Sequence, residues 1–369
     1  MRLTIPGIAL VAGFALMIFA VLTFNHPPVR AIERGAPGVG MQVEYNPSQL
    51  AALQKANMMP AILPAAAPGG PLAGNVYKNV QVLKNVPVGS FVRLMVSMTN
   101  WIAPQQGCGY CHVAGNFAAD TKYTKVVARR MLQMTMAVNA DYQTHVGAVG
   151  VTCYTCHRGN PVPVHWFSGP QPGMSVGVAE SDMGKNLPAA AADFSSLPSD
   201  PFTPFLLGNP APIRVEGTTA LPTGNRQSIK QTDWTYALMM HYSTALGVNC
   251  AFCHNTRAFG DWSESTPQRV KAWYGLRMVR DLNLNYMVPL TPVFPADQRG
   301  PLGDVAKINC ATCHLGVYKP MFGAKMAASF PELEGPSQVS ATGSALSAPP
   351  MAPPMPMGTT APATNGAKP

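Results

Sequence analysis

Charged side chains are scarce in this sequence. They make up 12% of its 369 residues, against 47% for hydrophobic residues. That balance excludes a largely disordered chain and predicts one large domain or two smaller ones with real cores. Proline and glycine are abundant by contrast, at 37 and 33 residues, and both interrupt regular structure. We therefore expect a mainly α-helical fold with long irregular loops.

Charge is absent altogether from a hydrophobic run near the N-terminus. The run from Ile5 to Phe24 is close to the ~20 residues that cross a bilayer as a helix, and longer than the ~7–15 apolar residues of a signal peptide. We predict that residues 1–25 form a retained transmembrane anchor. A cleaved signal peptide is the alternative, although Arg30 fits poorly in a cleavage site ending at Ala31. No cysteine lies near this segment to carry a lipid anchor.

No cysteine is left over for a disulfide, because all eight fall in C-x-x-C-H units. The units are Cys108, Cys111 and His112; Cys153, Cys156 and His157; Cys250, Cys253 and His254; and Cys310, Cys313 and His314. This pattern is typical of c-type haem attachment, in which two thiols bond the vinyl groups and the histidine binds the iron. Tetrahedral zinc sites would not explain a histidine after every second cysteine. The sequence predicts four covalently bound haem c groups.

The sixth iron ligand separates an electron carrier from a catalyst, because an open position admits substrate. Histidines outside the motifs are few: His26, His145, His165 and His241. A helix is predicted before each motif, with Ser90 as cap of the first and Asp233 as cap of the third. These helices carry Met95 and Met98; Met131, Met134 and Met136; Met239 and Met240; and Met278. Any one methionine can be core filler, but the recurrence before all four motifs favours iron ligands.

The chain also repeats itself. Residues 151–163 align with residues 308–320, and residues 128–142 align with residues 275–286. The repeat predicts two haem-pair halves, 75–165 and 229–320, related by a pseudo-twofold axis. A connector rich in proline, glycine, alanine and serine, 166–228, joins them within a domain spanning 26–335. Residues 336–369 are predicted to form a disordered tail.

Over about residues 75–325 the pattern resembles the tetrahaem cytochrome subunit of purple bacterial photosynthetic reaction centres. The resemblance rests on four C-x-x-C-H units in two pairs, methionine-bearing helices before them, a histidine shortly before the second motif and a proline-rich connector. In that family three haems have His/Met ligation and one is bis-histidine. By position, this implies the pairs Met95–His112, Met131–His157, Met239–His254 and His145–His314. The internal repeat alone nominates Met278 for the fourth haem.

The resemblance also implies the function. Electrons from a soluble periplasmic donor, a cytochrome c or a high-potential iron-sulfur protein, would pass along a nearly linear series of haems to the photo-oxidised special pair. The third haem would lie next to the pair and the first farthest from it. The protein would be an electron carrier without bond-making catalysis, associated with the reaction-centre L and M subunits, and H in the complex.

The predicted location follows from haem attachment on the outer side of the bacterial inner membrane. The haem domain would be periplasmic, held by a single-pass helix. The formal charge of +9 is offset by the haem propionates, so it identifies no donor, and we expect no nucleic-acid partner.

Two other classes carry several C-x-x-C-H units. A membrane-anchored tetrahaem quinol dehydrogenase of a respiratory chain favours histidine-rich ligation in a more compact domain. A multihaem reductase needs an accessible five-coordinate iron, often with lysine in place of a motif histidine. All four motifs here end in histidine, which disfavours the reductase.

Replacing Met239 by leucine is expected to perturb only the third haem and to slow re-reduction of the special pair, because leucine offers no thioether. The near-infrared methionine–iron band and flash kinetics measure the two effects. A Met239→Leu variant with an intact thioether signal for every haem would show the ligand assignment to be wrong.

Overall fold

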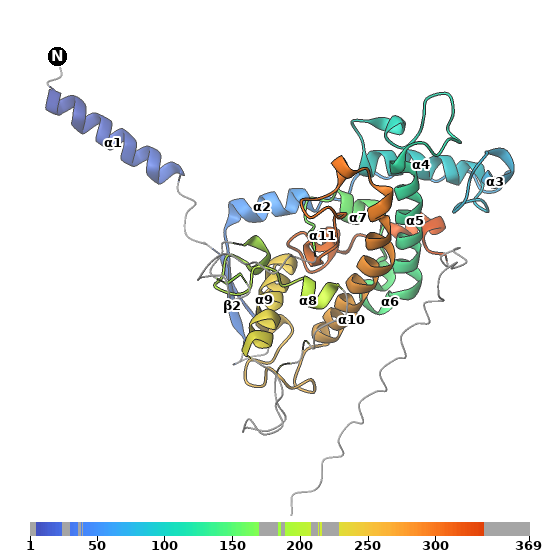
Figure 1. The fold of residues 1–369 in the computed structure, drawn as a ribbon. Helices are drawn as coiled ribbons and strands as arrows, with labels where there is room; N and C mark the ends of the chain where they lie inside the picture. The colour runs from blue at the N-terminus through green and yellow to red at the C-terminus, as the bar shows by residue number, and fades with distance from the viewer. Residues whose placement is uncertain are drawn as a thin grey trace, which may run out of the picture. The chain divides into compact units, whose positions relative to one another are not determined.

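The structure, a computed structural model, describes residues 5–23, 30–35, 38, 40–169, 184–185, 189–207, 213, 215 and 229–335. Its helices and strands are α1 Ile5–Thr23, β1 Arg30–Arg34, β2 Met41–Tyr45, α2 Pro47–Ala56, α3 Ala73–Val76, α4 Val88–Ile102, α5 Tyr123–Asp141, α6 Gln143–Val146, α7 Cys153–His157, α8 Thr203–Leu206, α9 Ile229–Leu246, α10 Pro267–Leu282 and α11 Cys310–His314. The described chain is mainly helical (Figure 1), as predicted. The predicted tail and much of the predicted connector lie outside the described residues.

The N-terminal hydrophobic run forms the helix α1. Among the described residues it is the one helix long and apolar enough to cross a membrane, and none of its span from Pro6 to Thr23 is buried inside the structure. A signal sequence passes the same test of length and composition. After it, β1 and β2 pair as an antiparallel hairpin with Ile32 opposite Val43.

The two helix caps predicted from the sequence are wrong. The helix α4 begins at Val88 after Pro87, whose ψ of 142° is extended, so Ser90 lies inside the first turn. Pro87 takes the N-cap position, and its carbonyl accepts from the Phe91 amide at 2.9 Å. The helix α9 begins at Ile229, which leaves Asp233 inside it. The helix α4 ends at Ile102, two residues before Pro104.

One hydrophobic core lies between α4, α5 and the last described segment of the chain. We call it the α4–α5 core; its members include Leu94, Met98, Trp101, Leu132, Met136, Phe330 and Leu333. The rings of Trp101 and Phe330 meet edge to face at 4.8 Å between centroids. The Arg93 guanidinium lies over the Phe330 ring and donates to the Ser329 carbonyl at 2.7 Å. The end of the described chain is therefore fastened to an early helix.

A second core lies between α8, α9 and α10, and we call it the α9–α10 core. It includes Phe202, Phe205, Leu206, Leu238, Leu276, Met278, Val279 and Leu282. Phe205 and Leu206 belong to the segment predicted as a connector, yet they are almost completely buried. Full burial of such side chains stabilises a fold by about 1.5–3 kcal/mol each. The described part of this segment thus supplies core packing.

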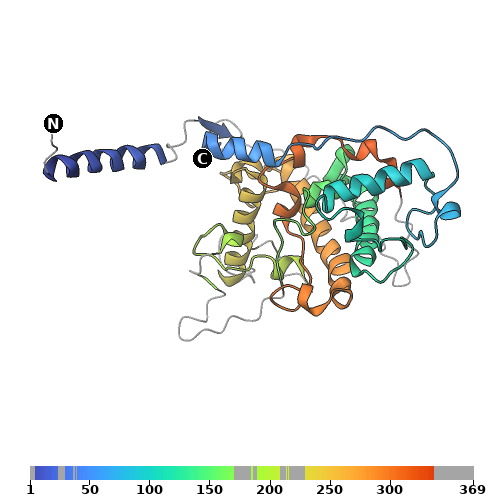
Figure 2. The ribbon, with the colours of Figure 1, turned by 90° about the horizontal axis from the view of Figure 1, so that it is seen from above.

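Helices α5 and α10 lie side by side in both views (Figures 1 and 2). The Tyr142 hydroxyl, next to the end of α5, donates to the Asp281 carboxylate on α10 at 2.6 Å. Arg130 on α5 contacts the Tyr286 ring, with 4.6 Å from the guanidinium carbon to the ring centroid. These contacts join the helices that precede the second and the fourth motifs.

Two buried asparagines make the same contacts in the two halves of the chain. Asn139 accepts from the Val151 amide at 2.7 Å and donates to the Val151 carbonyl at 3.0 Å. Asn283 accepts from the Ile308 amide at 2.8 Å and donates to the Ile308 carbonyl at 2.9 Å. Val151 and Ile308 each lie two residues before a motif. Each asparagine therefore fixes where its helix lies against the motif that follows.

Replacing Asn283 by leucine should lower the free energy of unfolding by about 2–4 kcal/mol, because it leaves the buried amide and carbonyl of Ile308 without partners. Guanidinium denaturation of the haem-loaded protein measures the loss. The exposed Asn75, replaced by leucine, serves as the control and should change stability by less than about 0.5 kcal/mol. We call each asparagine with its two backbone hydrogen bonds an asparagine clamp. A loss below about 1 kcal/mol for Asn283→Leu would contradict a stabilising role of the Asn283 clamp.

Candidate haem-binding sites

The second and fourth motifs fold as single helical turns, α7 and α11. In each, the amide just before the first cysteine donates to a threonine hydroxyl inside the turn: Thr152 to Thr155 and Asn309 to Thr312, both at 3.0 Å. The residue after each histidine is left-handed, with φ 49° at Arg158 and 48° at Leu315. Residues other than glycine rarely adopt this conformation. The chain therefore leaves both motif helices through the same unusual backbone conformation.

The first and third motifs share a different local structure, the 3₁₀ turns η1 (Gly107–Tyr110) and η5 (Cys250–Phe252). A threonine further along the chain ties down each turn. Thr124 donates to the Tyr110 carbonyl and Thr266 to the Phe252 carbonyl, both at 2.6 Å. Each motif histidine also contacts a phenylalanine five residues later, with ring centroids 4.9 Å apart for His112 and 5.1 Å for His254.

All four motif histidines hydrogen-bond a backbone carbonyl through Nδ1. The acceptors are the carbonyls of Phe117 for His112 at 3.1 Å, Asn160 for His157 at 2.9 Å, Phe259 for His254 at 2.9 Å and Val317 for His314 at 3.0 Å. A carbonyl only accepts, so the proton lies on Nδ1, and Nε2 carries the lone pair with which a neutral imidazole binds a metal. Histidine ligands of metals are oriented in this way.

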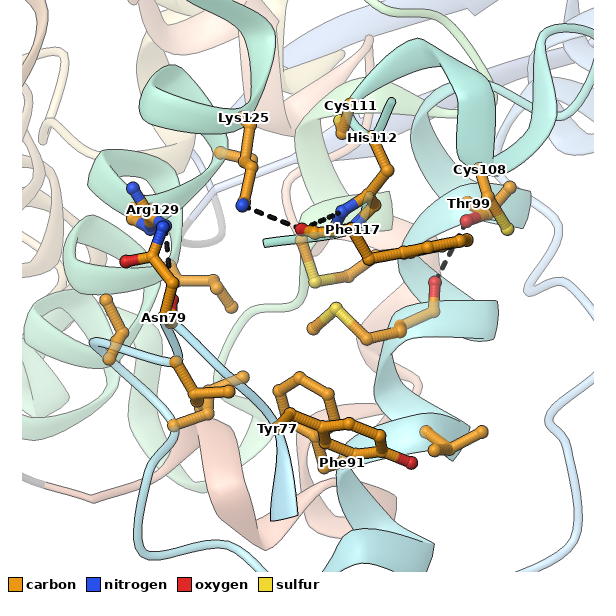
Figure 3. A pocket seen from close by; sticks show the side chains of 18 of the residues that line it. Tyr77, Asn79, Phe91, Thr99, Cys108, Cys111, His112, Phe117, Lys125 and Arg129 are labelled. Carbon is orange, nitrogen blue, oxygen red and sulfur yellow. Dashed lines mark hydrogen bonds between the residues drawn. The ribbon is translucent and has the colours of Figure 1, made fainter. Parts of the chain in front are cut away.

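A cavity of about 520 Å³ lies beside the first motif. Cys111 and His112 lie on one side of it, and Tyr77 and Phe91 on the opposite side (Figure 3). Met95 and Met98 from α4 also line it. The volume is within the range of cofactor pockets, about 300–1,000 Å³. Two thiols, an imidazole and two thioethers line this apolar cavity, which contains the donor set of a c-type haem.

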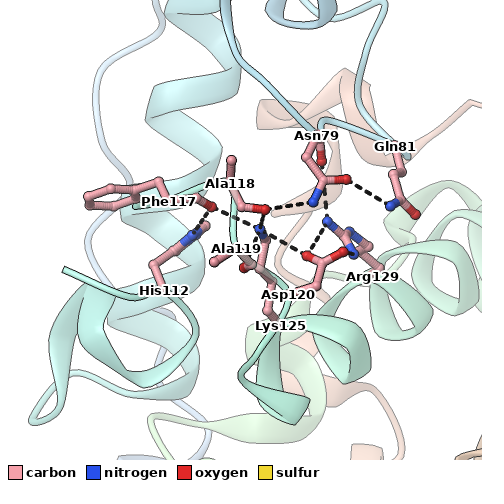
Figure 4. Close-up of polar contacts among 9 residues, drawn as sticks. All are labelled: Asn79, Gln81, His112, Phe117, Ala118, Ala119, Asp120, Lys125 and Arg129. Carbon is pink, nitrogen blue, oxygen red and sulfur yellow. Dashed lines mark hydrogen bonds and ion pairs between the residues drawn. The ribbon is translucent and has the colours of Figure 1, made fainter. Parts of the chain in front are cut away.

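Polar contacts hold the loop that orients His112 (Figure 4). The Lys125 ammonium donates to the carbonyls of Phe117, Ala118 and Ala119 at 2.8–2.9 Å. It also pairs with the Asp120 carboxylate at 3.1 Å, which Arg129 binds through two nitrogens at 2.8 and 2.9 Å. Hydrogen bonds from Arg129 and then Asn79 hold the pKa of Asp120 well below its usual range.

His145 has the same Nδ1 arrangement as the motif histidines, although it lies outside any motif. Its Nδ1 bonds the Lys271 carbonyl at 2.8 Å. No such bond is seen for His165 or His241 in the described part of the chain, and His26 lies outside it. The Nε2 of His241 is buried without a hydrogen-bond partner among the described residues.

His145 faces His314, with ring centroids 6.0 Å apart. A metal bound at about 2 Å to one nitrogen of each ring separates two imidazole centroids by about 6 Å. Burial, and then the neighbouring His145, lowers the pKa of His314 to about 4, and burial also lowers the pKa of His145. Both rings are therefore neutral near pH 7, as metal ligands must be.

The methionines predicted as ligands differ in how closely the structure places them. Met95 shares the first cavity with His112. Met131 lies on α5, which packs against the second motif helix α7. Met239 is half-buried on α9 and packs against the α9–α10 core. Met278, nominated by the repeat, is buried within that core.

The second and fourth motifs lie against each other, which the sequence analysis missed. The helices α7 and α11 pack against each other, and the thiols of Cys156 and Cys313 are neighbours. Arg158 donates to the Cys313 carbonyl at 3.3 Å and to the Asn57 side chain at 3.3 Å, and Asn57 donates to the Leu315 carbonyl at 3.0 Å. Nothing in the sequence marks Asn57, which lies far from every motif.

Comparison with known proteins gives consistent matches. The family model described as "Photosynthetic reaction centre cytochrome C subunit" matches residues 25–334. The chain is 52% identical over 327 residues to the photosynthetic reaction center cytochrome c subunit of Rubrivivax gelatinosus, covering 88% of each chain. It is 48% identical over 333 residues to that of Thermochromatium tepidum, covering 90% of this chain and 80% of the relative. That of Roseobacter denitrificans is 39% identical over 334 residues, covering 85% of this chain and 88% of the relative.

The ion pairs of Asp120 should make stability depend on pH. Because the folded state lowers the pKa of Asp120, its contribution is complete above the ordinary value of about 3.9 and is lost as the pH falls below it. Replacing Asp120 by asparagine should cost about 0.5–1 kcal/mol at pH 6, a size typical of an exposed pair. That difference from the unmodified protein should shrink at about pH 3.

Guanidinium unfolding at the two pH values measures the effect, with Asp297→Asn as a matched exposed control. A difference between the Asp120→Asn variant and the unmodified protein that stayed constant between the two pH values would contradict the explanation.

Proposed function

The chain belongs to the photosynthetic reaction centre cytochrome c subunit family, and we propose that it is a tetrahaem member that reduces the photo-oxidised special pair. Its role is electron transfer in the reaction centre. A soluble periplasmic donor, a cytochrome c or a high-potential iron-sulfur protein, gives up one electron. The oxidised bacteriochlorophyll pair receives it, so no bond is made or broken.

Each haem would be held by one C-x-x-C-H motif. The cysteines Cys108, Cys111, Cys153, Cys156, Cys250, Cys253, Cys310 and Cys313 would attach four haem c groups. His112, His157, His254 and His314 would bind one face of each iron, and Met95, Met131, Met239 and His145 the other. When bound, the haems supply reversible one-electron chemistry. The backbone carbonyls that accept from Nδ1 orient each imidazole, so that Nε2 would be the nitrogen that binds the iron.

The four sites would have different potentials because their ligands differ. A methionine thioether favours ferrous iron and raises the potential, whereas a second imidazole lowers it. Met95, Met131 and Met239 would therefore give three higher-potential sites. His145 would give one lower-potential site, and the 6.0 Å between its ring and that of His314 supports this assignment.

A succession of helix contacts supports a linear arrangement. The Gly159 amide, after the second motif, donates to the Trp101 carbonyl of α4, and the Gly316 amide, after the fourth motif, donates to the Ala245 carbonyl of α9, both at 2.8 Å. The helices α7 and α11 pack against each other. The order along the molecule would then be first, second, fourth and third motif, with the first and third at the two ends.

A pseudo-twofold relation of the two halves is part of the proposal. It is supported by the contacts that the motifs share, in which the first resembles the third and the second resembles the fourth. The equivalent asparagine clamps of Asn139 and Asn283 extend the likeness into the preceding helices.

The site of action would be the periplasmic face of the inner membrane. The helix α1 would remain as a single-pass anchor, and the haem domain would contact the L and M subunits of the reaction centre, with H in the same complex. Covalent haem attachment outside the cytoplasm supports this side of the membrane. The special pair would lie nearest the third motif, and the donor would bind toward the first.

The observation that carries the proposal is that each of the four C-x-x-C-H motifs presents a histidine whose Nδ1 is hydrogen-bonded to the backbone. Flash excitation of native membranes tests it. Haem oxidation, followed at the c-type α-band, should accompany re-reduction of the special pair. A strain lacking this chain should re-reduce the pair more slowly.

A respiratory quinol dehydrogenase would give a different result in the same experiment. Haems that stay reduced after a flash but become reduced by added quinol in the dark would identify a quinol dehydrogenase instead.

A further inference from the structure

A glycine in the middle of α10 has no backbone reason to be there. Gly275 has no positive φ, and a glycine inside a helix is less favourable than alanine. It is also buried. Its surroundings must therefore explain why a side chain is absent.

The ring of His145 fills the space that a side chain at Gly275 would take. A Cβ built on Gly275 would lie 2.5 Å from Cε1, 2.8 Å from Nδ1 and 3.0 Å from Nε2 of His145. The ring has little freedom to move away, because its Nδ1 bonds the carbonyl of Lys271, one turn earlier on the same helix. On its other side it faces His314.

Gly275 also occupies a particular position in the repeat. The asparagine clamps give the register of the two helices against their motifs. Eight residues before Asn139 lies Met131, and eight residues before Asn283 lies Gly275. In the same register Met278 corresponds to Met134, and both pack in or against the α9–α10 core. The repeat thus nominates Gly275, and not Met278, as the counterpart of Met131.

We propose that Gly275 is the positioning residue that gives the fourth haem an imidazole in place of a thioether. Glycine at this place removes the methionine that the first half carries and, by the same change, opens the space that admits His145. The inference rests on the proposed function, in which Met131 and His145 are iron ligands. Gly275 itself touches no iron; it acts through the position of the His145 ring.

The test uses the complete haem-loaded protein and added imidazole as the probe. In a His145→Gly variant the space beside Gly275 stays open, so imidazole should bind and restore the bis-imidazole electron paramagnetic resonance signal of one haem. In a His145→Gly/Gly275→Ala variant the added Cβ occupies that space. Imidazole should then bind about tenfold more weakly or worse, while the methionine–iron bands of the other haems stay unchanged.

A His145→Gly/Gly13→Ala variant is the control, because Gly13 is also inside a helix and has nothing within 4 Å of an added Cβ. It should bind imidazole as the single variant does. Since the large ring is already gone, the alanine at position 275 has no histidine to strain against, and the double variant should fold.

Equal imidazole affinity in the single variant and the Gly275→Ala double variant would overturn the proposal and leave Gly275 a helix-packing residue. Absence of a bis-imidazole signal from the unmodified protein would overturn it as well. Flash-induced haem oxidation in the same membranes reports the proposed function separately, so electron transfer can stand while this inference fails.

Discussion

The hydrogen bond from a histidine Nδ1 to a backbone carbonyl is the interaction on which the rest of this structure depends. It recurs at the four motif histidines and at His145. An imidazole without that bond can rotate and can carry its proton on either nitrogen, so its lone pair has no fixed direction. The loop after each motif places a backbone carbonyl within hydrogen-bonding distance of the histidine Nδ1. Lys125 holds the first of these loops by its hydrogen bonds to three carbonyls.

The apolar side chains beside the first motif enclose a cavity instead of packing against one another. The cavity beside the first motif is bounded by apolar side chains of α4 and α5, and large apolar faces of a cofactor are the natural partners for such walls. The buried hydrophobic side chains of the described residues form two separate cores instead of one continuous interior. Short helical turns suffice at the motifs because covalent bonds to the cysteines would fix their place.

Much of the candidate haem-binding sites could be predicted from the sequence, because most of the residues proposed to hold the haems lie in four short contiguous motifs. The eight cysteines and four motif histidines are a local pattern, and the helices predicted before the motifs are present as α4, α5, α9 and α10. The caps at Ser90 and Asp233 were wrong because both helices begin earlier in the chain than the local capping preference indicates. Asn57 and the contact between Cys156 and Cys313 join segments far apart in the chain, and no local signal reports such contacts.

The repeat shows the same limit. Letter-by-letter alignment favoured Met278 as the counterpart of a ligand, because a methionine matches a methionine. The register became evident only from the contacts of Asn139 and Asn283, which align the helices by what they touch. An amide side chain that spans two backbone groups is a more reliable marker of equivalence than a hydrophobic residue, because its geometry admits one placement.

The last described segment has a consequence for biogenesis. Ser329, Phe330 and Leu333 pack on or hydrogen-bond to Arg93, Trp101 and Asn139, so α4 and α5 acquire their final neighbours only when residues 329–333 have been synthesised. The α4–α5 core therefore cannot be completed in the order of synthesis. A chain that ended before residue 329 would leave the α4–α5 core open on that flank.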